Sequence, residues 1–212
     1  MKSLWLIFIT AFMITFSGAL MPGPLLSTTI SESGRRGWTV GPLFILGHAI
    51  LELLLLAGLF LGLAPLLTSE IAFVVIAFAG GGFMVWMSAG MIRSLPTLSL
   101  EVGSVRTVKS LPLTGALMSL ANPYWIIWWA TIGLSYVLSA RDFGPWGVAA
   151  FFAGHILVDF LWYTFVSVGI HKGRKILPLK VYKGVIGVCA LFLLGYAGFL
   201  IFNGVDRLIF VL

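Results

Sequence analysis

The sequence predicts an all-α integral membrane protein with six transmembrane helices. Of its 212 residues, 60% are hydrophobic and only 9% are charged, whereas about a quarter of the residues of a soluble domain are charged. Apolar runs long enough to span a bilayer, which takes roughly 20 residues, recur along the whole chain. Two of these runs contain a histidine and a carboxylate, so we expect a membrane protein with a polar centre rather than an ordinary soluble domain.

Six apolar segments, separated by short polar or turn-forming stretches, define the expected helices. They cover approximately residues 4–31, 40–64, 71–92, 112–138, 146–170 and 184–204. The breaks between them carry Gly, Pro, Ser and charged residues, which favour turns. We therefore divide the chain into a first three-helix repeat (1–93), a cytoplasmic linker (94–111) and a second three-helix repeat (112–212).

The basic residues predict the orientation of the chain in the plasma (inner) membrane. If the N-terminus is outside, ten of the 13 Lys and Arg residues lie in inner loops, and only Lys2, Arg141 and Arg207 lie outside. The inner group consists of Arg35, Arg36, Arg93, Arg106, Lys109, Lys172, Arg174, Lys175, Lys180 and Lys183. The positive-inside rule then places both termini outside. The net charge of +6 is thus a topology signal and not a sign of nucleic-acid binding.

Proline breaks the first and the fourth predicted helices. Pro22-Gly23-Pro24 interrupts the first and Asn122-Pro123 the fourth. Proline removes a backbone donor and clashes with the preceding turn, so each helix must kink or unwind there. The half-helix after Pro24, with Thr28 in its first turns, and the one after Asn122 would present free amide donors, which attract a carboxylate.

The second and fifth segments each place a histidine four residues before a carboxylate. His48 and Glu52 share one helical face, and His155 and Asp159 share another. Counted from the nearest inner basic residue, these side chains lie 12–17 residues into the membrane. At 1.5 Å per residue this is a depth of roughly 18–26 Å, near the midplane.

Because each half contains three helices, which is an odd number, the second half must enter the membrane in the opposite direction to the first. This arrangement is an inverted repeat. The recurring His-x-x-x-acid motif is the main support, and Gly18–Met21 also recurs as Gly115–Met118. Secondary transporters built from inverted repeats bind substrate near the midplane, between broken helices.

These motifs are similar to those of the LysE/RhtB family of amino-acid exporters. The resemblance extends over the whole chain and is carried by Met21–Pro24, by Arg35-Arg36-Gly37, by the Gly-rich second segment up to Gly62, and by Asn122-Pro123. It implies a six-helix plasma-membrane exporter of amino acids or related metabolites that is driven by an ion gradient. The paired His-x-x-x-acid motif departs from better-known members and leaves the substrate open.

We therefore interpret the chain as a proton antiporter that exports an amino acid or similar zwitterion, and not as an enzyme. Glu52 and Asp159 would exchange protons or bind the cationic part of the substrate, and His48 and His155 would tune them. Trp128 either lines the cavity or faces lipid. We expect no cofactor, and a homodimer is left open.

Three alternatives use the same residues. Two imidazoles and two carboxylates could form the four-ligand site of a divalent-metal exporter. A membrane-embedded enzyme could use them for acid–base chemistry, although no nucleophile motif supports this. The two pairs could also serve only to hold the second and fifth helices together by hydrogen bonds.

Overall fold

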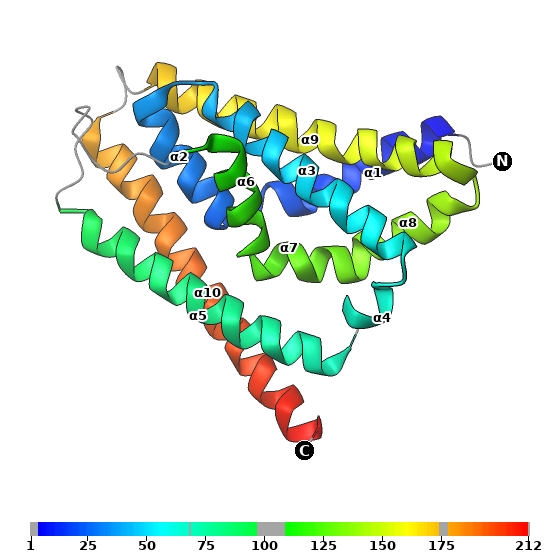
Figure 1. The fold of residues 1–212 in the computed structure, drawn as a ribbon. Helices are drawn as coiled ribbons and strands as arrows, with labels where there is room; N and C mark the ends of the chain where they lie inside the picture. Colours follow the sequence, from blue (N-terminus) through cyan, green and yellow to red (C-terminus); the bar gives the residue numbers. More distant parts are fainter. Residues whose placement is uncertain (1–3, 68, 97–108, 174–177, 212) are drawn as a thin grey trace.

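The computed structural model describes residues 4–67, 69–96, 109–173 and 178–211, and every regular element within them is a helix (Figure 1). The first half contains α1 (Leu4–Ala19), α2 (Pro24–Arg36), α3 (Val40–Phe60), α4 (Ala64–Leu67) and α5 (Glu70–Ser94). The second half contains α6 (Leu111–Leu120), α7 (Pro123–Trp128), the π-helix η1 (Trp129–Gly133), α8 (Leu134–Arg141), α9 (Gly144–Gly173) and α10 (Leu179–Val211).

Several of these helices are long and apolar enough to cross a membrane. Among the described residues, α3, α5, α9 and α10 each meet this condition, and the pair α1 and α2, bent by 78°, makes a fifth candidate. The multi-pass membrane fold is thus confirmed. The fourth expected crossing, 112–138, is divided among α6, α7, η1 and α8 and is not among these candidates, so the number of six crossings stays a prediction.

Both proline breaks occur where the sequence predicts them. α1 ends at Ala19 and α2 begins at Pro24, while α6 ends at Leu120 and α7 begins at Pro123. The first helical position suits proline because its missing N–H has no partner there anyway. Asn122 caps α7, since its Oδ1 accepts a hydrogen bond from the Tyr124 amide at 3.1 Å. Asn122 is thus the N-cap of α7.

Helices of the first half pack against helices of the second half. α1 packs on α9 of the other half, α6 packs on α3, and α5 packs along α10. A Cβ added at Gly47 would collide with the carbonyl of Pro112, and one added at Gly154 would collide with the carbonyl of Phe8. Glycine thus allows each broken helix to lie directly on the histidine-bearing helix of the opposite half.

The first glycines of the two similar tetrapeptides, Gly18–Met21 and Gly115–Met118, have different neighbours. Gly115 lies against the carbonyl of Phe44, whereas Gly18 faces the Trp128 indole. The correspondence of the two tetrapeptides therefore stays a prediction.

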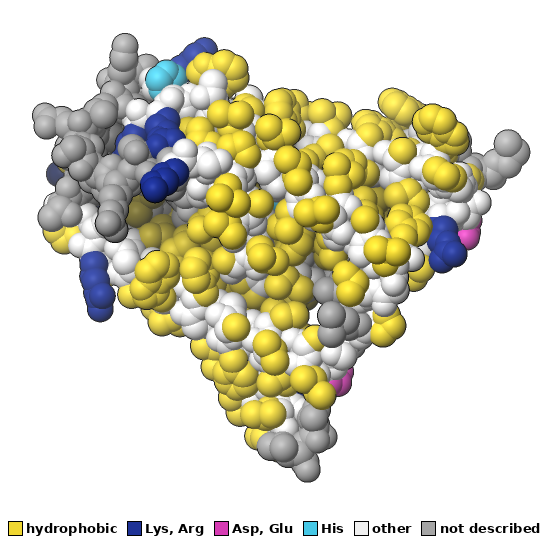
Figure 2. Space-filling view, viewed as in Figure 1, with side chains coloured by type: hydrophobic (Ala, Val, Ile, Leu, Met, Phe, Trp, Pro, Cys, Tyr) yellow, Lys and Arg dark blue, Asp and Glu magenta, His cyan; other side chains and the backbone are white. Residues whose placement is uncertain are grey.

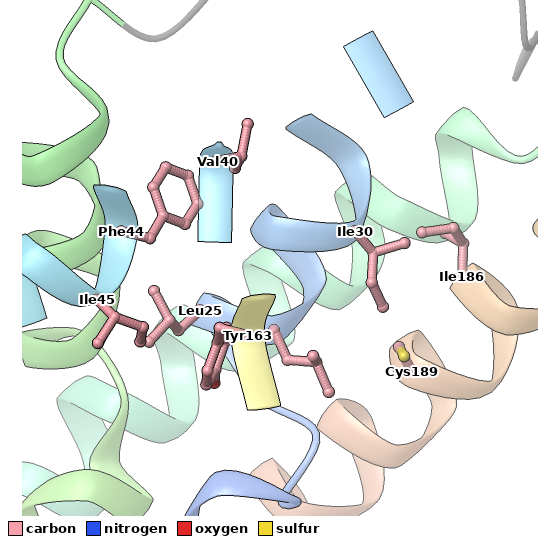
Figure 3. Close-up of a cluster of buried hydrophobic side chains, with 9 residues drawn as sticks. Leu25, Ile30, Val40, Phe44, Ile45, Tyr163, Ile186 and Cys189 are labelled. Carbon is pink, nitrogen blue, oxygen red and sulfur yellow. The ribbon is translucent and has the colours of Figure 1, made fainter. Parts of the chain in front are cut away.

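Buried apolar side chains join the helices around the polar centre. One cluster packs α2 and α3 against α9 and α10; Figure 3 shows its residues Leu25, Ile30, Val40, Phe44, Ile45, Tyr163, Ile186 and Cys189. A second surrounds Trp129 and Phe151, and a third holds α5 against α10. Cys189 lies inside the first cluster, away from the polar centre.

The outer surface is mostly apolar, as a lipid-facing surface must be. Figure 2 shows hydrophobic side chains over most of the visible face, while Lys and Arg gather near the end where α2 and α9 end and α10 begins. The grouping agrees with the predicted inner loops. Most of the predicted linker 94–111, including Arg106, lies outside the described residues, as do Arg174 and Lys175.

Replacing Gly47 by alanine is expected to destabilise the protein, because the new Cβ would meet the rigid backbone of Pro112. Overpacking of this kind costs about 1–3 kcal/mol of unfolding free energy. Gly154→Ala should lower the stability in the same way, because its Cβ would meet the backbone of Phe8. The check is the thermal unfolding midpoint of the purified protein in detergent, with Gly82→Ala as the control, because a Cβ at Gly82 meets nothing within 4 Å. Equal midpoints for Gly47→Ala and Gly82→Ala would contradict the proposed close packing.

Candidate functional site

The two His-x-x-x-acid motifs meet in the interior where α3 packs against α9. His48, Glu52, His155 and Asp159 are all buried, and one ligand atom from each lies within 4.8 Å of the others. The Nε2 atoms of both histidines lie 3.0 Å from carboxylate oxygens of Glu52, and 3.6 Å from Oδ2 of Asp159. The two motifs therefore form one cluster and not two separate pairs.

A hydroxyl group from a broken helix holds each imidazole ring. Ser119 Oγ of α6 lies 2.7 Å from Nδ1 of His48, and Thr15 Oγ1 of α1 lies 2.8 Å from Nδ1 of His155. Both hydroxyls donate their own hydrogen to the carbonyl four residues earlier in the same helix, at 2.9 and 2.7 Å. Each hydroxyl must therefore accept a hydrogen from Nδ1, which directs Nε2 toward the carboxylates.

Two indole groups fix the carboxylate of Glu52. Its Oε1 accepts hydrogen bonds from Trp125 Nε1 at 3.0 Å and from Trp129 Nε1 at 2.8 Å. Hydrogen bonds from N–H groups to a carboxylate are stronger than those between neutral groups, and Glu52 is completely buried. The indoles therefore hold the carboxylate of Glu52 in a fixed orientation.

Two carboxylate oxygens of the cluster are left without a hydrogen bond. Oε2 of Glu52 and Oδ2 of Asp159 are buried and accept no well-directed hydrogen bond, although Oε2 lies 3.0 Å from Nε2 of His155. A neutral imidazole with its hydrogen on Nδ1 has a lone pair at Nε2 and would need a proton or another cation between it and a carboxylate oxygen at 3.0 Å, whereas an imidazolium donates its own Nε2 hydrogen to that oxygen.

The cluster forms one wall of a small cavity between the broken helices. Its solvent-accessible volume is about 50 Å³, which leaves room for a few water molecules at roughly 10–15 Å³ each. The lining residues are Thr15, Gly18, Ala19, Met21, Leu25, His48, Glu52, Ser119, Asn122, Tyr124, Trp125, Trp128, His155, Asp159 and Tyr163. A solute larger than a few waters requires the helices to separate.

Not every residue expected in the pathway lines this cavity. The cluster residues, Asn122 and Trp128 do. The structure places Pro22, Gly23, Pro24, Thr28 and Pro123 outside the lining, and the Thr28 hydroxyl donates to the carbonyl of Pro24 at 2.8 Å.

Trp128 lies in the interior and not on the lipid-facing surface. Its ring stacks on His155 with a centroid distance of 4.9 Å, and its Nε1 donates to Ser17 Oγ at 3.2 Å. The next residue, Trp129, is completely buried as well. Of the two roles that the sequence left open for Trp128, the structure supports lining of the cavity.

The sequence interpretation missed four polar contacts of the cluster: those of Thr15, Ser119, Trp125 and Trp129. Thr15 and Ser119 are isolated hydroxyl residues in apolar segments, which is a weak signal, because such hydroxyls are usually satisfied by their own helix. From the sequence, Trp125 and Trp129 are aromatic residues that could line a cavity or belong to an interfacial belt, and nothing in the pattern predicts their hydrogen bonds to a carboxylate. Their hydrogen bonds depend on how the helices pack, which no local pattern specifies.

Comparison with known proteins gives two matches. A family model described as LysE type translocator matches residues 16–204. The chain is also similar to the chemotactic transduction protein ChpE of Pseudomonas aeruginosa, with 28% identity over 204 residues, covering 91% of this chain and 96% of the relative. No solved structure matches the chain.

Trp129→Phe is expected to lower the free energy of unfolding by about 1–3 kcal/mol, because a buried carboxylate loses a hydrogen-bond donor. Chemical unfolding of the purified protein in detergent measures this. Trp146→Phe is the matched control, since Trp146 is exposed. In a Glu52→Met background the cost of Trp129→Phe should shrink, because the acceptor is gone. If Trp129→Phe lowers the free energy of unfolding equally with and without the Glu52 carboxylate, Trp129 contributes only through packing.

Proposed function

The chain belongs to the LysE type translocators, and we propose that it exports an amino acid or a related zwitterion across the plasma membrane in exchange for protons. Family membership and the apolar helices make it a multi-pass membrane protein that transports small molecules. The observation that carries the finer proposal is the buried cluster of two imidazoles and two carboxylates beside the two broken helices. Ionisable groups inside membrane proteins mark pathways of ions and substrates.

The acidic side of the cavity suits the ammonium group of an amino acid. Oε2 of Glu52 and Oδ2 of Asp159 are buried without hydrogen-bond partners. A primary ammonium offers three N–H donors, enough to satisfy both oxygens. We propose that the ammonium group binds there when the cavity is open to solvent.

The meeting point of the two helix breaks suits the carboxylate group. A Cβ added at Gly23 would lie 2.9 Å from Nδ2 of Asn122, so the two breaks adjoin. α2 begins there without a side-chain cap, and the hydroxyl of Ser27 in its first turn is buried without a partner. Free amides at a helix N-terminus favour an anion, so these donors would hold the carboxylate of the substrate.

The proton is the coupling ion that we propose. Each contact between an imidazole Nε2 and Glu52 needs a shared hydrogen, and the ammonium of a substrate brings its own. Binding of substrate would thus displace hydrogens from the cluster, which links the two fluxes.

The reciprocal packing supports an inverted repeat as the framework of the transport cycle. Thr15 of α1 holds His155 of the second half, and Ser119 of α6 holds His48 of the first. We propose that the halves run in opposite directions and rock about the cluster, as inverted-repeat transporters do.

Glu52→Gln and Asp159→Asn are each expected to abolish export that depends on a proton gradient, because each keeps the side chain's shape but removes its charge. Uptake of labelled amino acids into inverted vesicles, with and without a pH gradient, measures this. Glu70→Gln is the control, since Glu70 is an exposed carboxylate at the start of α5 that is paired with Arg207 at 2.8 Å. Full gradient-driven uptake by both cluster variants would contradict this role and would show that the two His-x-x-x-acid motifs only hold the helices together.

The proposed orientation, with both termini outside, predicts which loops an impermeant thiol reagent reaches. In a Cys189→Ser background, a cysteine at Asp142 should be labelled in intact cells, and one at Lys172 only after permeabilisation. Both native side chains are exposed at the ends of helices. Labelling of position 172 from outside would reverse the orientation.

A further inference from the structure

We infer that His48, Glu52, His155 and Asp159 also bind one divalent transition-metal ion of the Zn²⁺ or Co²⁺ type. The inference rests on the proposed function only in that the ion would enter the same transport site. It assigns a second class of ligand to that site, in which one doubly charged ion takes the place of the hydrogens between the imidazoles and the carboxylates.

The four groups point electron pairs toward one another. The hydroxyls of Thr15 and Ser119 contact the Nδ1 atoms, so the Nε2 atom of each ring faces the carboxylates and can serve as the ligand atom. The indoles of Trp125 and Trp129 occupy Oε1 of Glu52, which leaves Oε2 free. Asp159 contributes Oδ2, which also lacks a partner.

The spacing of these atoms is short enough for one metal ion to bridge them. Zinc bonds of about 2.0–2.1 Å to nitrogen and oxygen place neighbouring ligand atoms roughly 3.3 Å apart. In the cluster, Nε2 of His155 lies 3.0 Å from Oε2 of Glu52, and the Nε2 atoms of both histidines lie 3.6 Å from Oδ2 of Asp159. One ligand atom from each of the four residues lies within 4.8 Å of the others, so the set must draw together slightly to surround one ion.

The kind of ligand and the charge select the class of ion. Two imidazoles with two carboxylates suit zinc and its neighbours in the first transition row, whereas Ca²⁺ takes six to eight oxygen ligands. Two carboxylates neutralise a doubly charged ion, which matters in a buried site because an unbalanced charge is costly there.

The surroundings resemble the supporting shell of known metal sites. Metal-binding histidines almost always donate their second N–H to a fixed acceptor, and loss of such a partner weakens binding by roughly 10–100-fold. Here the acceptors are hydroxyls from two helices other than α3 and α9. Ring orientation is therefore set before any ion arrives.

Titration of the purified full-length protein with Co²⁺ tests the inference, provided that the affinity tag contains no histidine. Tetrahedral Co²⁺ gives intense visible absorption bands, so we expect these bands to saturate at one ion per chain and to disappear on addition of Zn²⁺. They should be lost in His48→Gln and in His155→Gln. His171→Gln is the matched control, because His171 is exposed at the end of α9, and it should bind like the unmodified protein.

Variants of the supporting hydroxyls keep the inference testable if the histidine variants fail to fold. Thr15→Ala and Ser119→Ala retain all four ligands and are expected to bind Co²⁺ roughly 10–100-fold more weakly. Ser88→Ala is their control, since the Ser88 hydroxyl donates to Ala190 between α5 and α10 and should leave binding unchanged. Equal affinity in all three variants would contradict the assigned ligand geometry.

Two results would overturn the inference: no tetrahedral Co²⁺ spectrum at millimolar concentration, or binding that survives in His48→Gln/His155→Gln. Neither would affect the proposed amino-acid export, which the vesicle experiment tests separately. Amino-acid uptake without Co²⁺ binding would leave only the proposed function standing, and Co²⁺ binding without amino-acid uptake would leave only the metal site.

Discussion

The fully buried carboxylate of Glu52 is the constraint around which the centre of the molecule is arranged. A charge taken out of water is costly unless it is paired and hydrogen-bonded. Two indoles from the second half donate to it, and both imidazoles lie within 3.0 Å. These partners come from three different segments of the chain. Only a fold that brings α3, α7 and α9 together, with η1 following α7, can keep this charge inside.

The broken helices and the glycines make that arrangement accessible. α1 and α6 stop near the centre of the protein, which lets α2 and α7 begin beside the cavity. Gly47 and Gly154 then allow α6 and α1 to approach α3 and α9 closely enough for Ser119 and Thr15 to reach the histidines. Close packing and polar recognition thus depend on the same backbone contacts.

Local sequence signals predicted the features that local chemistry determines. Ionisable groups in apolar runs predicted the residues of the cluster, and prolines predicted both helix breaks. The last helix is longer than the predicted 184–204, because Lys180 and Lys183 at its start and Arg207 near its end are good helix formers outside the apolar stretch.

What could not be predicted depends on the packing of distant segments. The Trp125 and Trp129 hydrogen bonds belong to this class, and so do the close contacts of Phe8 with Gly154 and of Pro112 with Gly47. The π-helix after Trp128 has no signature in the sequence either. It winds the chain more widely than an α-helix, just where the consecutive residues Trp128 and Trp129 are both buried.

The hydroxyl contacts of Thr15 and Ser119 have a mechanical consequence. Each joins a broken helix of one half to a histidine of the other, so neither helix can shift without releasing the ring that it orients. The position of the helices and the occupancy of the cluster are therefore thermodynamically linked, and the influence must be reciprocal. A cation that stabilises one ring orientation also stabilises one arrangement of the helices, by the same free energy.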